Sequence, residues 1–184
     1  MQSYDNFYLT TYITGNLSNS FEDRPEFELH SIAETQPLWN SLCEIITNSI
    51  STEDDVIVFC LGKHQFTGEY DNKSFITDII NSASLGSQLL IGGCASFGNA
   101  VPITKRLYWV DGVEGLYFFV VFRSAYEYIL KAVPKEDEDV GCVLSRTLSN
   151  KILIVPQILA MGVECKTNQK LTTYQRIIDK YNIF

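Results

Sequence analysis

The sequence is poor in the residues and motifs that metal centres most often use. It has only two histidines, His30 and His64, and its cysteines form no C-x-x-C pair. It also contains no H-E-x-x-H motif and no calcium loop of the D-x-[DN]-x-[DN]-G type. We therefore expect no bound metal ion.

Signals for a nucleotide cofactor, a membrane span or export are missing as well. Neither G-x-x-x-x-G-K-[ST] nor G-x-G-x-x-G occurs, and no apolar run reaches the roughly 18 residues that cross a bilayer. The amino-terminal residues lack the basic and apolar regions of a signal peptide. The five widely spaced cysteines are typical of reduced core residues: Cys43, Cys60, Cys94, Cys142 and Cys165. These features predict a cytoplasmic protein that has no cofactor and does not contact a membrane.

What the chain does have is an excess of acid. Its 22 aspartates and glutamates against 14 lysines and arginines give a net charge of −8. Such a field repels phosphate backbones, which disfavours direct binding of DNA or RNA, and it attracts a cationic partner. Many of the carboxylates gather in three clusters, which are Glu22, Asp23, Glu26 and Glu28, then Glu53, Asp54 and Asp55, and finally Glu136, Asp137, Glu138 and Asp139.

The placement of these clusters between apolar segments allows two interpretations. Acidic patches of this kind complement the surface of a basic protein and speed the encounter with it. Runs of charge are also common in solvated turns that bind nothing. We predict that the three clusters bind a basic protein, and the second interpretation stays open for any single cluster.

The 184 residues, 46% of them hydrophobic, predict a single globular domain over residues 1–184. Apolar and β-branched runs indicate strands at 7–13, 27–29, 56–62 and 87–93, and helical spacing indicates helices at 37–50, 71–84, 124–133 and 167–184. Two further strands, 106–110 and 116–122, flank an Asp111-Gly112 turn and predict a β-hairpin. The expected fold is α+β, with a largely antiparallel central sheet and three to four helices.

A catalytic alternative rests on the glycine-rich segment 92–102, which we expect to be a loop. Cys94 and Ser96 lie among its small residues, and His64 follows a predicted buried strand. The local pattern is C-x-S-x-G rather than the G-x-S-x-G elbow of hydrolases, and no histidine follows it in the chain. A small cytosolic enzyme of hydrolase type would use His64 with Cys94 or Ser96.

An acidic chain without a recognisable active site has the general character of a bacterial immunity protein. In this interpretation its acidic loops cover the active face of a basic toxin, and the toxin we expect is a nuclease. The small enzyme is the first alternative, and a regulatory interaction domain whose partner is not a toxin is the second. The sequence leaves the oligomeric state open.

Overall fold

The computed structural model describes residues 8–14, 21–32, 35–62 and 64–161. The predicted helix at 167–184 and Cys165 lie outside the described residues. The strands are β1 (Leu9–Thr14), β2 (Phe27–Ile32), β3 (Val56–Cys60), β4 (His64–Phe66), β5 (Leu89–Phe97), β6 (Ala100–Pro102), β7 (Leu107–Val110), β8 (Val113–Phe122), β9 (Lys151–Ile154) and β10 (Leu159–Met161). The helices are α1 (Leu38–Thr52), α2 (Asn72–Ser84), α3 (Arg123–Lys131) and α4 (Val140–Thr147). None of these helices combines the length and apolar character needed to cross a membrane.

Eight strands form one mixed sheet in the order β2-β1-β3-β8-β5-β9-β7-β6, and β10 pairs with β4 in a separate two-stranded sheet. Within the large sheet, β1 pairs in parallel with both β2 and β3, and β5 pairs in parallel with β9. The other pairings are antiparallel. The α+β class is confirmed, whereas the largely antiparallel sheet is only partly correct. The crossover through α1 brings β3 alongside β1 in parallel, as such connections commonly do.

The predicted hairpin at 106–122 is wrong. β7 pairs with β6 and β9, while β8 lies between β3 and β5. Asp111 and Gly112 therefore form a corner between distant strands. There the backbone N–H and side-chain amide of Asn99 donate to the Asp111 carboxylate over 2.8 and 2.7 Å, which ties this corner to the turn between β5 and β6. β8 is apolar on both faces, so burial at the centre of a sheet outweighs the local turn signal.

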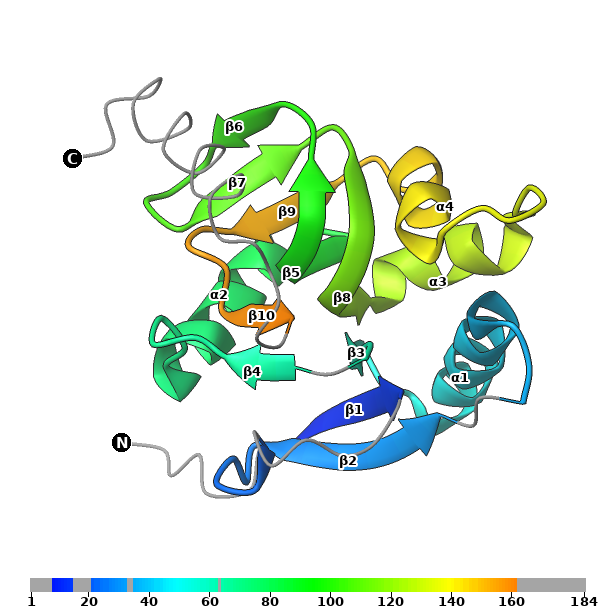
Figure 1. The fold of residues 1–184 in the computed structure, drawn as a ribbon, viewed down its shortest axis with the longest axis horizontal. Coiled ribbons are helices and arrows are strands. Elements are labelled where there is room, and N and C mark those ends of the chain that lie inside the picture. The colour runs from blue at the N-terminus through cyan, green and yellow to red at the C-terminus, as the bar shows by residue number, and fades with distance from the viewer. Residues whose placement is uncertain (1–7, 15–20, 33–34, 63, 162–184) are drawn as a thin grey trace.

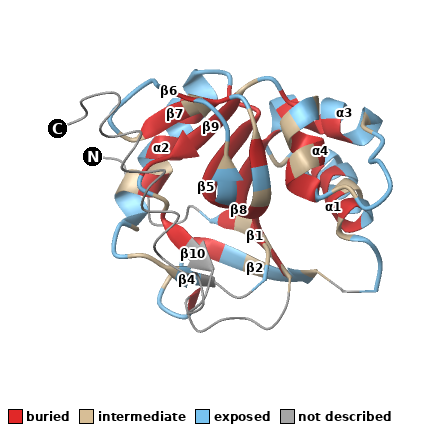
Figure 2. Cartoon of the chain, turned by 45° about the horizontal axis from the view of Figure 1, so that its top comes forward, coloured by how far each residue is buried: buried red, intermediate tan, exposed pale blue. Residues whose placement is uncertain are grey.

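Helices cover both faces of the sheet. Figure 1 shows α1, α3 and α4 together on one side, with α2 and the β4–β10 pair on the other. Two apolar cores result. One joins α1, α3 and α4 to the sheet, and the other joins Phe75 and Ile79 of α2 to Phe118 of β8 and Leu159 of β10. The central strands β8 and β9 are mostly buried (Figure 2), whereas β2 and β6 at the edges of the sheet are partly exposed.

The segment predicted as a glycine-rich loop at 92–102 is mainly strand. β5 continues through it to Phe97, and β6 begins at Ala100. A Cβ atom at Gly92 or Gly93 would overlap the ring of Phe118 or Tyr117 on the neighbouring strand. These glycines therefore accommodate the aromatic rings of the neighbouring strand, and they do not mark a turn.

Candidate functional site

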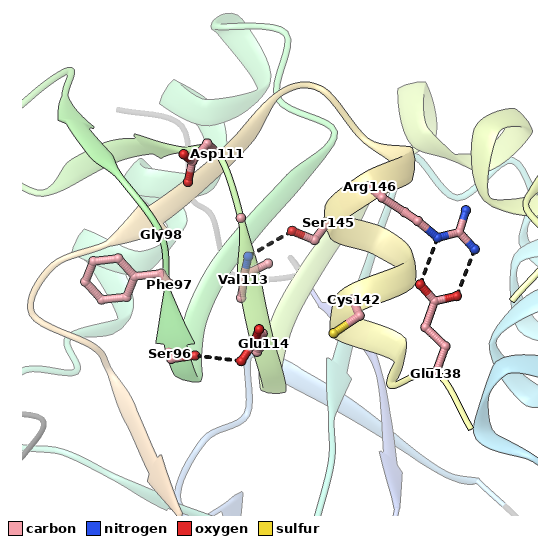
Figure 3. Close-up of a pocket in the computed structure, with 11 residues that line it drawn as sticks. Ser96, Phe97, Gly98, Asp111, Val113, Glu114, Glu138, Cys142, Ser145 and Arg146 are labelled. Atoms are coloured by element: carbon pink, nitrogen blue, oxygen red, sulfur yellow. Dashed lines mark hydrogen bonds and ion pairs between the residues drawn. The ribbon is translucent and has the colours of Figure 1, made fainter. Parts of the chain in front are cut away.

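A hollow lies between α4 and the sheet (Figure 3). We call it the α4 pocket, and its volume is about 560 Å³. Ser96 at the end of β5, Glu114 at the start of β8 and Asp111 at the corner before it line the sheet side. Cys142 and Arg146 of α4 line the other side, and Glu138, just before α4, completes the rim.

The pocket has this shape because α4 is held close to β8. The Val113 N–H donates to the Ser145 hydroxyl over 2.9 Å. Gly141 lies so near the backbone of β8 that an added Cβ would be 3.3 Å from the backbone nitrogens of Gly115 and Leu116. The Asp139 carboxylate accepts the Gly141 N–H over 2.8 Å and caps the helix. Asp139 therefore has a structural role in addition to its charge.

The residues from 132 to 139, which we call the acidic loop, are fixed by hydrogen bonds from their own neighbours. Arg146 donates to both Glu138 oxygens over 2.8 and 2.9 Å and to the Val133 carbonyl over 2.6 Å. The Lys135 N–H donates to Glu138 over 2.8 Å. These bonds, that of Arg146 above all, lower the pKa of Glu138 to about 2. The loop is therefore ordered by the side chain of Glu138.

The other two carboxylates of the acidic loop lie at the surface. Glu136 and Asp137 are exposed, and within the described residues neither has a hydrogen-bonded or ionic partner. Asp137 adopts a left-handed backbone with φ of 56°. The Val133 side chain in the same loop is 77% exposed. The ordered loop thus presents two unpaired negative charges and one apolar side chain to the surroundings.

The carboxylates around the α4 pocket affect the pKa of the Cys142 thiol. Burial raises the pKa of Cys142, and the charges of Asp139, Glu114 and Glu138 raise it further. Glu114 is exposed and accepts a 3.3 Å hydrogen bond from Ser96. The pocket therefore favours positive charge, although Arg146 lies at its rim.

The first acidic cluster lies far from this site. Figure 1 places the turn before β2 at the lower left and the acidic loop at the right edge of the molecule. Glu26 is only 7% exposed and accepts a hydrogen bond from the Tyr70 hydroxyl, whereas Glu22, Asp23 and Glu28 are exposed. Glu26 is therefore part of the core on this side.

The second acidic cluster occupies a third connection, between α1 and β3. Asp54 accepts a 2.6 Å hydrogen bond from Thr52, and Asp55 lies 3.6 Å from the guanidinium of Arg123 at the start of α3. Glu53 is exposed and adopts a left-handed conformation at the end of α1. The first cluster thus lies in β2 and the turn before it, whereas the other two lie on the α1–β3 and α3–α4 connections. The first and third do not share a surface (Figure 1). The prediction that they contact a partner stays a prediction.

The residues of the catalytic alternative belong to two different sheets, with Cys94 and Ser96 on β5 and His64 on β4. Cys94 is fully buried on β5, where its N–H donates to Gln157 over 3.1 Å. Ser96 is exposed at the α4 pocket. His64 belongs to β4, opposite Met161 of β10. No three histidine, cysteine or carboxylate side chains in the part of the chain that the structure covers are grouped as metal ligands.

Sequence reasoning missed two carboxylates of the site, Asp111 and Glu114. Both lie in the segment that we assigned to a hairpin turn, where acidic residues are unremarkable. No local signal links them to residues 136–139. Only the packing of α4 against β8 brings the two segments together.

No family model and no curated protein sequence matches the chain. Among solved structures, apo UDP-glucose pyrophosphorylase is similar at a TM-score of 0.47 and 7% identity over 70% of this chain, which spans 55% of that protein. A197 from STIV is similar at a TM-score of 0.47 and 13% sequence identity, over 80% of this chain and 81% of that one. HddC from Yersinia pseudotuberculosis, complexed with GMP-PN, is similar at a TM-score of 0.45 and 16% sequence identity. This similarity covers 88% of this chain and 71% of HddC. Likenesses at this level carry no argument about function.

Proposed function

We propose that this chain is a protein-binding module that recognises a basic partner through the acidic loop and the adjoining α4 pocket. One observation carries the proposal. Two unpaired carboxylates, Glu136 and Asp137, project from a loop that Arg146 and Glu138 hold in place beside a negatively charged hollow.

The order of the loop favours binding. A flexible loop must lose conformational freedom when it meets a partner, which costs about 0.5–1.5 kcal/mol for each side chain that becomes fixed. Hydrogen bonds to Glu138 and to the Val133 carbonyl already fix much of this backbone. The exposed Val133 side chain lies in the same loop and supplies the apolar contact that a purely acidic surface would lack.

The α4 pocket matches the side chain that a basic partner would contribute. A lysine or arginine that enters the pocket would approach the exposed carboxylate of Glu114 while its alkyl chain contacts the pocket wall. Charge pairs in such a position set the association rate and the register of a complex. The partner's cation would also offset the repulsion among the carboxylates around the pocket.

We propose an immunity or inhibitor role, in which the acidic surface covers the basic, nucleic-acid-binding face of a toxin of nuclease type. Inhibition is then steric and electrostatic and needs no chemistry from this chain. A regulatory partner that is not a toxin would use the same surface, and the two differ only in what co-purifies.

The test is a charge reversal at the loop matched to one elsewhere. Glu136→Lys with Asp137→Lys should abolish co-purification of a basic protein from the native host. The control, Glu22→Lys with Asp23→Lys, makes an identical change of charge on the far side of the molecule and should retain the partner. Association should slow as salt rises, mainly through the on-rate. Equal losses in both variants would reduce the effect to net charge and refute the site.

A second candidate is a small hydrolase-like enzyme, and the exposure of Ser96 at the α4 pocket favours it. The Ser96 hydroxyl donates to Glu114, so a carboxylate is in place to accept its proton. An activity that is lost in Ser96→Ala or His64→Ala, but retained when Glu136 and Asp137 are reversed, would support the enzyme and contradict the binding module.

A further inference from the structure

A second hollow of about 420 Å³ lies between α2 and the turn that joins β6 to β7. We call it the α2 hollow. Lys73, Thr77, Asp78 and Asn81 line it from the helix, and Lys105 and Arg106 line it from the turn. It shares no lining residue with the α4 pocket. Any ligand bound there would therefore make its contacts away from the proposed protein-binding site.

Arg106 is anchored rather than mobile. Its Nε and Nη2 atoms both donate to one oxygen of the largely buried Asp78 carboxylate, each over 3.1 Å. The turn is fixed as well, because the backbone N–H groups of Arg106 and Leu107 donate to the Thr104 hydroxyl over 3.2 and 3.0 Å. A guanidinium has five N–H donors, and Asp78 uses two of them. Donors are therefore left over at a fixed position.

The two lysines of the α2 hollow add positive charge to its lining. Within the described residues, neither Lys73 nor Lys105 forms a salt bridge with a carboxylate, and both are exposed. Two other surface cations, Lys131 and Arg146, do have acidic partners, which are Glu127 and Glu138. Two exposed ammonium groups and an anchored guanidinium thus line one hollow in a chain whose net charge is −8.

The nearby carboxylates are already engaged. Asp78 is bonded to Arg106, and Asp71 caps α2 by accepting the Ser74 N–H over 2.8 Å. Hydrogen bonding to Ser74 is the main reason that the pKa of Asp71 is low, and the charges of Arg106 and Lys73 lower it further. The three cations outnumber these two carboxylates, and the amide of Asn81 adds a neutral donor. A small anion would meet several donors and a net positive charge.

We propose that the α2 hollow binds a small molecule through a phosphate group. A phosphate presents several oxygen acceptors and up to two negative charges, which matches two lysines, the spare donors of Arg106 and an amide. Lysine acts as a point charge toward phosphate and arginine as a directional donor. The combination favours a compact oxyanion over a planar carboxylate, which needs only one of these groups.

Titration with inorganic phosphate, monitored by backbone amide NMR, tests the proposal. Saturable shifts confined to residues 72–82 and 103–107 are expected at constant ionic strength. Lys73→Gln with Lys105→Gln should weaken phosphate binding by about tenfold or more. Lys135→Gln, which removes an exposed cation from the acidic loop, serves as the control and should leave it unchanged. Both variants alter exposed side chains, so unfolding is not expected.

Two results would overturn the proposal. The first is an unsaturated, chain-wide response, or one that chloride reproduces at equal ionic strength. The second is binding to a lipid headgroup, which presents the same phosphate chemistry as a small molecule. A parallel experiment with vesicles that contain phosphatidic acid distinguishes these two sources of phosphate. Competition between vesicles and inorganic phosphate supports the small-molecule site, whereas vesicle binding that free phosphate does not affect contradicts it.

Discussion

The acidic loop performs two tasks, and substitutions at Asp139 separate them. Its carboxylate caps α4 by accepting the Gly141 N–H over 2.8 Å, and its charge contributes to the field at Cys142. Asp139→Ala removes both the cap and the charge. Asp139→Asn removes the charge but keeps a side-chain oxygen that caps a helix about equally well. A comparison of the two variants therefore isolates the hydrogen bond.

The expected magnitude follows from the cap. Loss of an N-cap acceptor costs about 1 kcal/mol, within a range of roughly 0.5–2. For a protein of this size, about 1 kcal/mol lowers the melting temperature by about 2–4 °C. The Asn variant should stay within about 0.5 kcal/mol of the wild type. The Asn variant should bind the basic partner about as well as the wild type, because Glu136 and Asp137 are unchanged and the cap that holds α4 is kept.

Urea unfolding, followed by the fluorescence of Trp39 and Trp109, gives the free energies of unfolding. Glu136→Gln is the control, since Glu136 is exposed and has no partner among the residues that the structure describes. It should leave stability unchanged and still weaken binding. If Asp139→Asn destabilised the protein as much as Asp139→Ala, the charge rather than the cap would hold α4, and the reasoning would fail.

Three further predictions concern the pocket and the sheet. The pKa of Glu138 is lowered to about 2, so its stabilising contribution is present above the ordinary value near 4.5 and is lost as pH falls toward 2. The difference in unfolding free energy between the wild type and Glu138→Gln should therefore shrink over this pH range. A difference that does not depend on pH would contradict this role of Glu138. Glu114→Gln should lower the pKa of Cys142, so iodoacetamide should label this thiol faster at mildly alkaline pH. Peptide mass spectrometry measures the labelling rate. An unchanged rate would mean that the charge of Glu114 does not affect the thiol. Gly93→Ala should destabilise the protein by about 1–3 kcal/mol in urea unfolding, because the new methyl group overlaps the ring of Tyr117. Gly68→Ala is the control, since its Cβ would meet nothing within 4 Å, and it should not destabilise the protein. Equal effects of the two substitutions would refute the packing argument.

Several elements follow from sequence patterns alone. The continuous apolar run at 56–62 predicts a strand covered on both faces, and β3 is buried from Ile57 to Cys60. The spacing at 71–84 predicts a helix, and α2 spans Asn72–Ser84 with Asp71 as its cap. These succeed because the deciding interactions are local, either along one strand or within the first turn of one helix.

The failures share a cause of the opposite kind. The pairing of β8 with β5 rather than β7, and the strand conformation at Gly92 and Gly93, both depend on residues far away in the chain. A turn signal such as Asp111-Gly112 reports only that the chain changes direction. It does not report which strand lies alongside afterwards, because burial of both faces of β8 decides that.

The same distinction explains why the four acids from 136 to 139 could not be interpreted as a unit. Sequence treats them as equivalent charges, but Arg146, seven residues beyond the run, engages Glu138, and the helix that follows engages Asp139. Two of the four therefore stabilise the fold and two stay available to a partner. The pocket beside them adds Glu114 from a strand more than twenty residues earlier in the chain. A binding surface defined by charge must therefore be counted in unpaired carboxylates that share a face, and the number of acids in a run overstates it.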